Sequence, residues 1–357
     1  MRAPLLAAVT LHHTGGGIAA VSRLIWRALQ DGWGAESRLI TMFEHETAPA
    51  TAFEKARYIA GLMIREALGA NDWILFSHLQ LAEVQDAVPP SVRRRYGVFI
   101  HGIEAWGDLT PRQRRVLTAA DLRVANSSYT ATRVMRRHPD IGFIDVCPLA
   151  LPPLERIDPA AHASGRGRRV LVVGRMSAAE RYKGHDELIE AWPSVVAAHP
   201  EAELVVVGHG DDTARLRSKA IASGVGSRIV FTGFVTATEL DRLYDTATLF
   251  ALPSRGEGFG IVYLEAMRRG LCCIGSVHDA AGEVIVDGTT GRLVDLEQPH
   301  MLADVITDVL RDDVRRAEMG ASGRDRALGE FGFERFRARL LSLLPARSDG
   351  PVEAVTA

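Results

Sequence analysis

The sequence predicts an α/β protein of two domains, each built on a mostly parallel sheet. Short apolar runs of strand length alternate with longer segments of helical periodicity along the chain, and this alternation is typical of βαβ units. A stretch rich in proline and glycine, residues 151–167, interrupts the alternation and reads as a hinge between domains. At 357 residues the chain is also too long for one compact core.

The strands are predicted where apolar residues gather in short runs bounded by glycine, proline or polar residues. In the first domain, residues 1–152, they fall at 5–11, 36–42, 73–77, 96–101, 122–126 and 144–148, and the first helix falls at 18–30. In the second domain, residues 153–330, they fall at 169–174, 203–208, 228–233, 249–253 and 272–276. Ligands of open α/β sheets bind at the carboxyl ends of the strands, so functional residues are expected there.

A last helix is predicted over residues 333–344, within a segment spanning 331–345. Its apolar positions follow a break of glycines and phenylalanines at 329–333 and are Phe336, Leu340, Leu341, Leu343 and Leu344. The remaining residues, 346–357, are expected to be disordered.

The composition is that of an ordinary globular enzyme, with 47% hydrophobic and 24% charged residues. Three cysteines without regular spacing exclude a disulfide framework and a zinc site. The apolar run at 5–9 reads as a buried strand and not as a signal peptide, and no stretch approaches the length of a membrane span. A net charge of −2 and the lack of a recognisable binding motif argue against nucleic acid as a partner.

The most informative segment is 253–265, which carries two glutamates separated by a Gly-x-Gly turn and an apolar run. Gly258 and Gly260 let the backbone turn tightly and approach a ligand closely. The apolar residues from Ile261 onward indicate a helix, whose N-terminus is an anion site suited to a diphosphate. Glu257 before the helix and Glu265 inside it can then bind hydroxyls on opposite sides of the phosphates. The spacing predicts a sugar-nucleotide site, the alternative being two solvated glutamates.

Two cations follow the first strand of the second domain. Breaking a sugar–phosphate bond leaves negative charge on the diphosphate, which a metal or fixed cations can meet. The sequence contains no Asp-x-Asp motif of the kind that usually holds such a metal. Arg175 offers a bidentate fork and Lys183 a point charge instead, although a solvated surface charge is the ordinary fate of both residue types. Arg181 is a weaker candidate.

Several motifs together resemble those of glycosyltransferase family four, a group of retaining enzymes with two Rossmann-like domains. They occur in the family's order between residues 12 and 291. Besides the glutamate segment, they are three glycines at 15–17, His-Gly-Ile-Glu at 101–104, Val-Gly-Arg-Met at 173–176, Arg-Tyr-Lys-Gly-His at 181–185, Phe-Thr-Gly-Phe-Val at 231–235 and a glycine-rich segment at 283–291.

This resemblance implies the GT-B architecture, with two Rossmann-like domains facing each other across a deep cleft and the last helix crossing back to the N-terminal domain. It implies a retaining hexosyltransferase that moves a sugar from a UDP- or GDP-sugar to an acceptor hydroxyl, with no metal or other cofactor. The implied catalytic residues are Glu257, His101, Lys183 and Arg175. The implied donor-binding residues are Gly16, Gly17, Arg175, Lys183, Gly208, Phe234, Val235, Glu257, Gly258, Phe259, Gly260, Ile261 and Glu265. Glu104 and His13 are expected near the acceptor.

The donor and the acceptor are less well specified. Members of the family that use GDP-sugars often carry an acid just beyond the strand at 228–233, where the first acid here is Glu239, and this distance favours UDP. Basic clusters at 93–95, 112–115 and 133–137 lie in the net-positive first domain. They suit a weak association with an anionic membrane surface and a lipid-linked acceptor of polysaccharide or glycolipid synthesis, although a solvated face is the alternative. A cytoplasmic enzyme, at the inner face of the membrane, is expected.

Other functions stay open at this point. A nucleotide-sugar epimerase of the same fold, a transferase acting on a small-molecule natural product and a non-catalytic sugar-nucleotide-binding subunit fit the same motifs. A dinucleotide-dependent dehydrogenase is disfavoured because the glycines at 15–17 lack the G-x-G-x-x-G spacing. Two active-site carboxylates also suit a retaining glycosidase, but such an enzyme has no use for an arginine–lysine diphosphate site.

Overall fold

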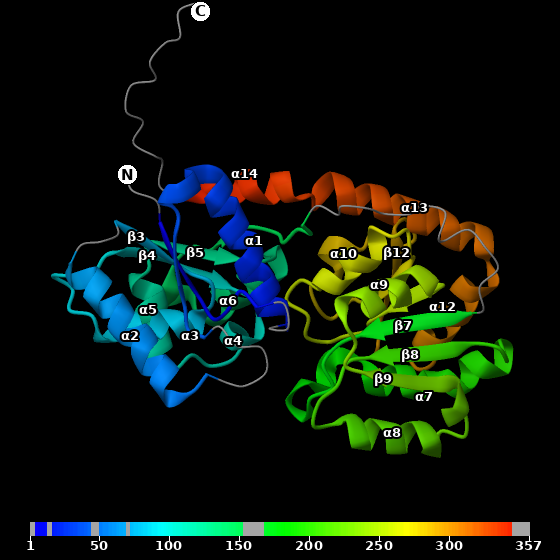
Figure 1. Cartoon of the computed structure of the whole chain (residues 1–357). Coiled ribbons are helices and arrows are strands. Elements are labelled where there is room, and N and C mark those ends of the chain that lie inside the picture. The colour runs from blue at the N-terminus through cyan, green and yellow to red at the C-terminus, as the bar shows by residue number, and fades with distance from the viewer. Residues whose placement is uncertain (1–3, 13–15, 44–49, 69–71, 153–167, 345–357) are drawn as a thin grey trace, which may run out of the picture. The chain divides into compact units, whose positions relative to one another are not determined.

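The computed structural model describes residues 4–12, 16–43, 50–68, 72–152 and 168–344. The chain divides into two compact units. The first unit comprises residues 1–150 together with the chain from Phe333 onward, and the second unit spans Leu151–Gly332. Each unit contains one six-stranded sheet with helices packed around it (Figure 1), and every strand pair described is parallel. The predicted α/β class with parallel sheets is therefore confirmed.

The sheet of the first unit has the strand order β2-β1-β3-β4-β5-β6. Its strands are β1 (Leu5–Ala8), β2 (Arg38–Thr41), β3 (Trp73–Phe76), β4 (Arg95–Ile100), β5 (Leu122–Ala125) and β6 (Asp145–Val146). The α-helices of this unit are α1 (Gly16–Trp33), α2 (Ala52–Ala67), α3 (Leu79–Ala82), α4 (Ile103–Trp106), α5 (Pro111–Ala119), α6 (Ser128–Arg137) and α14 (Phe333–Leu343). Both β1 and β3 are buried along their whole length, as expected of central strands covered on both faces.

The sheet of the second unit has the strand order β12-β11-β10-β7-β8-β9. Its strands are β7 (Arg169–Val173), β8 (Glu203–Val207), β9 (Ile229–Gly233), β10 (Leu249–Ala251), β11 (Cys273–Ser276) and β12 (Gly291–Val294). The α-helices are α7 (His185–Ala198), α8 (Thr213–Ala222), α9 (Ala237–Thr246), α10 (Ile261–Met267), α11 (Ala281–Val284), α12 (Met301–Arg311) and α13 (Asp313–Glu330). A 3₁₀ segment, η5 (Ala178–Lys183), joins β7 to α7.

The strands follow the sequence prediction closely. Each predicted run contains a strand, and most strands end one or more residues before the apolar run does. One strand, β12, was not predicted, because its four residues include Gly291 and Arg292 and are only partly buried. The predicted hinge falls almost entirely on residues 153–167, which lie outside the described part of the chain, as does the whole predicted tail, residues 346–357.

The last helix, α14, packs on α1 within the first unit (Figure 1). The guanidinium of Arg27 lies 4.9 Å from the centre of the Phe333 ring. The carbonyl of Phe336 lies 3.9 Å from the thiol of Cys147, and the Phe336 side chain is buried. The apolar face read from the sequence is thus the face that α14 buries.

Candidate active site

The strand order of the second sheet creates a switch point between β7 and β10. From β7 the chain builds outward through β8 and β9, and from β10 it builds in the opposite direction through β11 and β12. The loops after β7 and β10 therefore leave the sheet side by side in opposite directions, which is where ligands bind in open α/β folds. The segment with Arg175 and Lys183 follows β7, and the segment with Glu257 follows β10.

Lys183 and Glu257 meet at this switch point, although 74 residues separate them. The Lys183 Nζ lies 2.7 Å from Glu257 Oε1, and the two side chains are only 18% and 15% exposed. Burial alone would lower the pKa of Lys183, but the facing Glu257 carboxylate outweighs it and holds that pKa above its usual value. The lysine is therefore a permanent cation at the carboxyl ends of β7 and β10.

The backbone holds these two side chains together. The carbonyl of Tyr182 accepts hydrogen bonds from the Ser254 hydroxyl at 3.0 Å and from the Arg255 N–H at 2.8 Å. Ser254 is fully buried. Gly184 has a left-handed backbone with φ +81°, and its Cα faces the Pro253 carbonyl so closely that a Cβ there would overlap it. Loops from two strands are thereby joined on either side of Lys183.

Asp279 fixes the backbone of Glu257, and sequence reasoning missed it. Asp279 Oδ2 accepts the Glu257 N–H at 3.0 Å, Oδ1 accepts the Ala281 N–H at 2.9 Å, and the Ala280 N–H donates to the Glu257 carbonyl at 3.1 Å. Burial raises the pKa of Asp279 to about 7, partly offset by these N–H donors. Its position shortly after β11 was the available signal, because functional residues follow strand ends.

We expect a titration of Asp279 to shape the pH dependence of activity. Both oxygens act as acceptors, so protonation removes an acceptor from the loop that carries Glu257. Because the pKa lies near 7, kcat/KM should be highest above pH 7 and fall as the pH decreases through that value. Asp279→Asn should lower kcat/KM at high pH and abolish this acidic limb. A limb that persists unchanged in Asp279→Asn would assign the titration to another group.

The arginines near β7 differ in their partners. Arg175 is 68% exposed and pairs with Glu180, its Nε lying 3.1 Å from Glu180 Oε2. An exposed guanidinium on a loop at the switch point can turn toward an incoming anion at little cost. Arg181 instead pairs at 3.0 Å with the buried carboxylate of Asp212, so its role in this structure is to join η5 to the loop before α8.

The turn before α10 requires glycine at position 260. Gly260 caps α10 with φ +82°, and a Cβ would overlap the Tyr263 ring. The side chain of Phe259 is buried and packs edge-on against Phe331 at 5.7 Å, so Phe259 offers only backbone groups to a ligand. Six residues further on, the Glu265 carboxylate accepts a 2.8 Å hydrogen bond from the Tyr244 hydroxyl.

The turn after β9 presents an aromatic ring to solvent. Phe234 is 65% exposed and meets His209 edge-on, with 6.2 Å between ring centres, while the neighbouring Val235 is half-buried. Gly208, at the end of β8, lies so close to the Gly174 carbonyl that a side chain would overlap it. The exposed Phe234 ring, beside the closely packed backbone of Gly208 and Gly174, is a surface on which a nucleobase can stack.

In the first unit, His101 follows β4 and is held by four neighbours. Its Nε2 lies 2.7 Å from the Ser77 carbonyl, which can only accept, so Nε2 carries the proton. Its carbonyl accepts from the Asn126 side chain at 2.9 Å, and its ring stacks on His78 with 5.5 Å between centres. Glu104 accepts the His101 N–H at 2.5 Å, so this carboxylate closes the turn after β4. Asn126 and His78 were missed by sequence reasoning.

The first glycine loop is described only in part. Gly16 begins α1 with φ +67°, and space for a side chain is open at both Gly16 and Gly17. His13, predicted near the acceptor, lies outside the described residues. In the part of the chain that is described, no group of three or more His, Cys, Asp or Glu side chains is placed to hold a metal ion.

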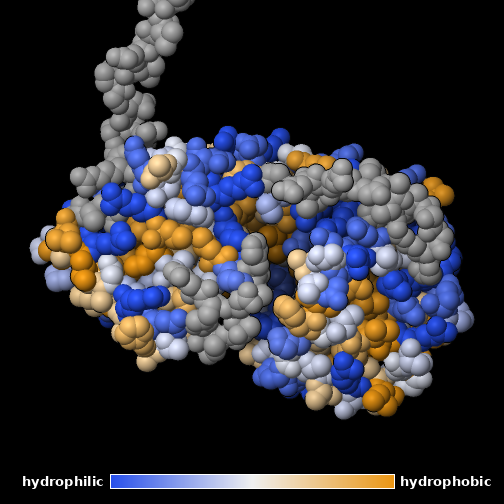
Figure 2. Space-filling model, in the orientation of Figure 1, coloured by the Kyte–Doolittle hydropathy of each residue, from blue (hydrophilic) through white to orange (hydrophobic). Residues whose placement is uncertain are grey.

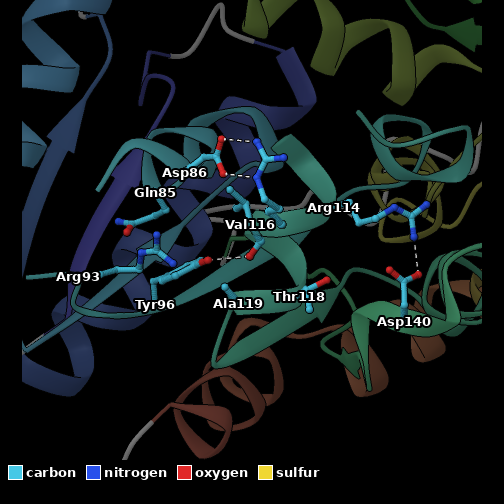
Figure 3. A pocket seen from close by; sticks show the side chains of 10 residues that line it. Gln85, Asp86, Arg93, Tyr96, Arg114, Val116, Thr118, Ala119 and Asp140 are labelled. Carbon is cyan, nitrogen blue, oxygen red and sulfur yellow. Dashed lines mark hydrogen bonds and ion pairs between the residues drawn. The ribbon is translucent and has the colours of Figure 1, made fainter. Parts of the chain in front are cut away.

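A cavity of about 440 Å³ lies elsewhere in the first unit, and three of the basic residues predicted to form surface patches line it (Figure 3). Two of these cations are paired with acids. Arg115 forms two 2.7 Å bonds to Asp86, and Arg114 pairs with Asp140 at 2.5 Å. The charge of the 112–115 cluster is therefore largely neutralised within the protein.

Comparison with known proteins agrees with this geometry. A family model described as glycosyl transferases group 1 matches residues 155–326. A GDP-mannose-dependent alpha-(1-6)-phosphatidylinositol monomannoside mannosyltransferase of Mycolicibacterium smegmatis is 32% identical over 273 residues, which cover 72% of this chain and 71% of that protein. The chain belongs to the group 1 glycosyl transferases. The family resemblance read from the motifs is thus confirmed, and with it the assignment as a glycosyltransferase.

Other relatives and solved structures extend the similarity. A phosphatidyl-myo-inositol mannosyltransferase of Mycobacterium tuberculosis is 36% identical over 44% of this chain and 42% of its own. The sucrose-phosphate synthase of Thermosynechococcus elongatus superposes with a TM-score of 0.78 at 20% identity, covering 96% of this chain and 98% of that one. Anabaena Alr3699/HepE in complex with UDP and glucose gives 0.73 at 17% identity, covering 96% and 99%. These structures confirm the GT-B architecture of this glycosyltransferase.

Proposed function

We propose that this glycosyltransferase is a retaining mannosyltransferase that uses GDP-mannose and an inositol-containing or similar membrane lipid as acceptor. The observation that carries the transferase site is the buried Lys183–Glu257 pair at the β7/β10 switch point. The proposal of donor and acceptor is supported by the relatives, which are named GDP-mannose-dependent and phosphatidylinositol mannosyltransferases.

The choice of GDP reverses the preference for UDP that the sequence suggested. That preference depended on the position of Glu239, the first acid after β9. In the structure Glu239 forms a capping box with Thr236, whose N–H donates to Glu239 Oε2 at 2.8 Å, so this carboxylate is used by its own helix. A guanine would then be read by backbone groups of the turn at Phe234 and Val235.

The predicted catalytic residues and Glu265 each have a role in the proposed reaction. Arg175 and Lys183 meet the charge that develops on the diphosphate as the bond from the sugar's anomeric carbon to the phosphate oxygen breaks. Glu257, held by Lys183 and Asp279, orients hydroxyls of the transferred sugar, and Glu265 binds the ribose hydroxyls. The acceptor oxygen attacks from the face that the phosphate leaves, and its proton passes to the departing phosphate oxygen. His101 is assigned to the side of the transferred sugar.

We propose further that no divalent metal takes part. The arginine and lysine after β7 already supply the positive charge that a metal would bring to the diphosphate. Transfer should therefore survive EDTA.

The full-length protein tests the proposal directly. It is incubated with radiolabelled GDP-mannose or UDP-glucose, with EDTA or Mg²⁺, and with vesicles containing phosphatidylinositol or a soluble sugar acceptor. Labelled lipid with an α-linked mannose supports the proposal. Transfer to soluble acceptors alone overturns the lipid acceptor, isomerised donor without transfer supports an epimerase, and transfer only from UDP-glucose overturns the choice of donor.

The exposed face of helix α2 supports a membrane-bound acceptor. Among the described residues, no helix is long and apolar enough to cross a bilayer. Helix α2, however, is apolar on its outward face as well as its buried face. It buries Tyr58 and Leu62, while its outward side exposes a second apolar set. That set is Phe53, Ile59, Met63, Ile64 and the following Leu68, which are 40–77% exposed. In the region of α2, Figure 2 shows orange atoms among blue ones at the surface.

The charges of α2 fit an anionic lipid surface. The cations Lys55 and Arg57 are exposed. Both acids of the helix are engaged within the protein, since Glu54 bonds to Thr51 in a capping box and Glu66 is buried, accepting the Arg94 N–H at 2.8 Å. An exposed apolar face flanked by free cations is typical of helices that lie in the membrane interface.

We expect substitutions on this face to release the protein from vesicles. Phe53→Glu combined with Ile64→Glu should weaken sedimentation with phosphatidylinositol-containing vesicles about ten-fold or more, because two apolar contacts are replaced by like charges. Ile221→Glu is the matched control, because Ile221 is 76% exposed on α8 in the second unit. Loss of self-association without loss of vesicle binding would show that a second copy of the chain covers this face.

A further inference from the structure

The carboxylate of Glu265 is held by a buried tyrosine. Tyr244 on α9 is 1% exposed, and its hydroxyl donates to Glu265 Oε2 at 2.8 Å. Glu265 lies on α10, so this hydrogen bond joins α9 to α10 at the proposed ribose site. A glutamate side chain has three rotatable torsions, and a hydrogen bond to a rigid buried ring removes most of that freedom.

Arg269 holds Tyr244 in turn. Its guanidinium lies 5.1 Å from the centre of the Tyr244 ring. The arginine is 5% exposed, donates to the Glu265 carbonyl at 3.1 Å, and pairs with Asp241 and with Asp245 at 3.3 Å, both on α9. The ring that orients Glu265 is therefore fixed by a buried cation that also ties α10 to α9.

The hydrogen bond also favours the form of Glu265 that can accept. Burial raises the pKa of Glu265, and the Tyr244 hydroxyl opposes this by donating to the ionised carboxylate. An ionised carboxylate has about four acceptor positions. Because the tyrosine fixes the orientation of the carboxylate through Oε2, the remaining acceptor positions of the carboxylate point in fixed directions. They are therefore oriented to accept hydrogen bonds from the hydroxyls of a ligand.

We infer that Tyr244 is a positioning residue for Glu265, and that it sets the preference of this enzyme for a ribose over a deoxyribose in its nucleotide. The inference rests on the proposed function, in which Glu265 binds the ribose hydroxyls. Tyr244 touches neither substrate nor reacting atoms, so its removal acts on donor recognition and leaves the chemical step intact.

The test compares the binding of GDP with that of 2′-deoxy-GDP and 3′-deoxy-GDP to the full-length protein by calorimetry. A hydrogen bond to a charged group contributes about 1.5–3 kcal/mol, so the wild type should prefer GDP to at least one deoxy form by about ten-fold or more. Tyr244→Phe, which removes only the hydroxyl, should reduce that preference to about three-fold. The KM for the donor should rise while kcat changes little, as for a loss of uniform binding.

Two further variants make the result decisive. Glu265→Gln should lose the ribose preference, and Tyr96→Phe should keep it, because Tyr96 donates at 2.7 Å to the Val116 carbonyl in the first unit. Full preference in Tyr244→Phe overturns the inference, and so does a wild type that binds GDP and both deoxy forms equally. A wild type that binds no guanosine nucleotide at all overturns the proposed donor instead.

Discussion

Lys183→Met should transfer sugar about 10²–10³ times more slowly than the wild type, with a normal fold. The substitution keeps the length of the side chain but removes the cation that the proposed reaction places on the leaving diphosphate, and the loss of one such group costs about this factor. It also leaves the 15%-exposed Glu257 carboxylate without its 2.7 Å partner. Steady-state kinetics with GDP-mannose measure the effect, and circular dichroism checks the fold.

A second lysine of the same unit is the control. Lys219 pairs with Asp186 and with Glu190 at 2.6 Å and is 27% exposed, yet it lies on α8, which follows β8 and neither β7 nor β10. Lys219→Met should keep nearly full kcat. Glu257→Gln should be as slow as Lys183→Met, and the double variant little slower than either, because the two side chains act as one unit. Wild-type turnover in Lys183→Met would defeat the assigned role.

The fold could be predicted from the sequence because its signals are local. Short apolar runs bounded by glycine, proline or polar residues coincide with eleven of the strands that the structure describes. The pair of Lys183 and Glu257 could be anticipated as well, since both follow predicted strand ends in recognisable motifs. Their contact could not be derived from spacing alone. It depends on β7 and β10 being neighbours, a property of the strand order and not of either segment.

The residues that escaped prediction act through long-range contacts. Asp279 meets the Glu257 N–H 22 residues away, and Tyr244 meets Glu265 21 residues away, and neither stands in a motif. The exposed apolar face of α2 was not predicted from the sequence for a different reason. Its apolar residues surround the helix, and an apolar residue in a helical pattern is ordinarily assigned to the core. Only the exposed fractions show that Phe53 and Ile64 face solvent.

The junction of the β7 and β10 loops depends on Gly184, so a single added methyl group should disable the enzyme. Gly184 has φ +81°, and its missing Cβ makes room for the Pro253 carbonyl oxygen. Alanine at this position must therefore both adopt a left-handed backbone, at about 1 kcal/mol, and push the β10 loop away from the loop that carries Lys183. Separating these loops would lengthen the 2.7 Å contact between Lys183 and Glu257.

Gly184→Ala should thus lower kcat/KM at least about 100-fold, since displacing a catalytic group by about 1 Å has an effect of that size. Gly224→Ala is the matched control, because Gly224 has φ +80° with open space where a Cβ would lie. Both variants carry the same backbone strain, and only Gly184→Ala carries the overlap. Thermal melting and donor kinetics on both variants separate the two effects. Equal kinetic losses would show that strain alone is responsible, and full activity in Gly184→Ala would show that the close packing of these loops is not needed to hold Lys183 at Glu257.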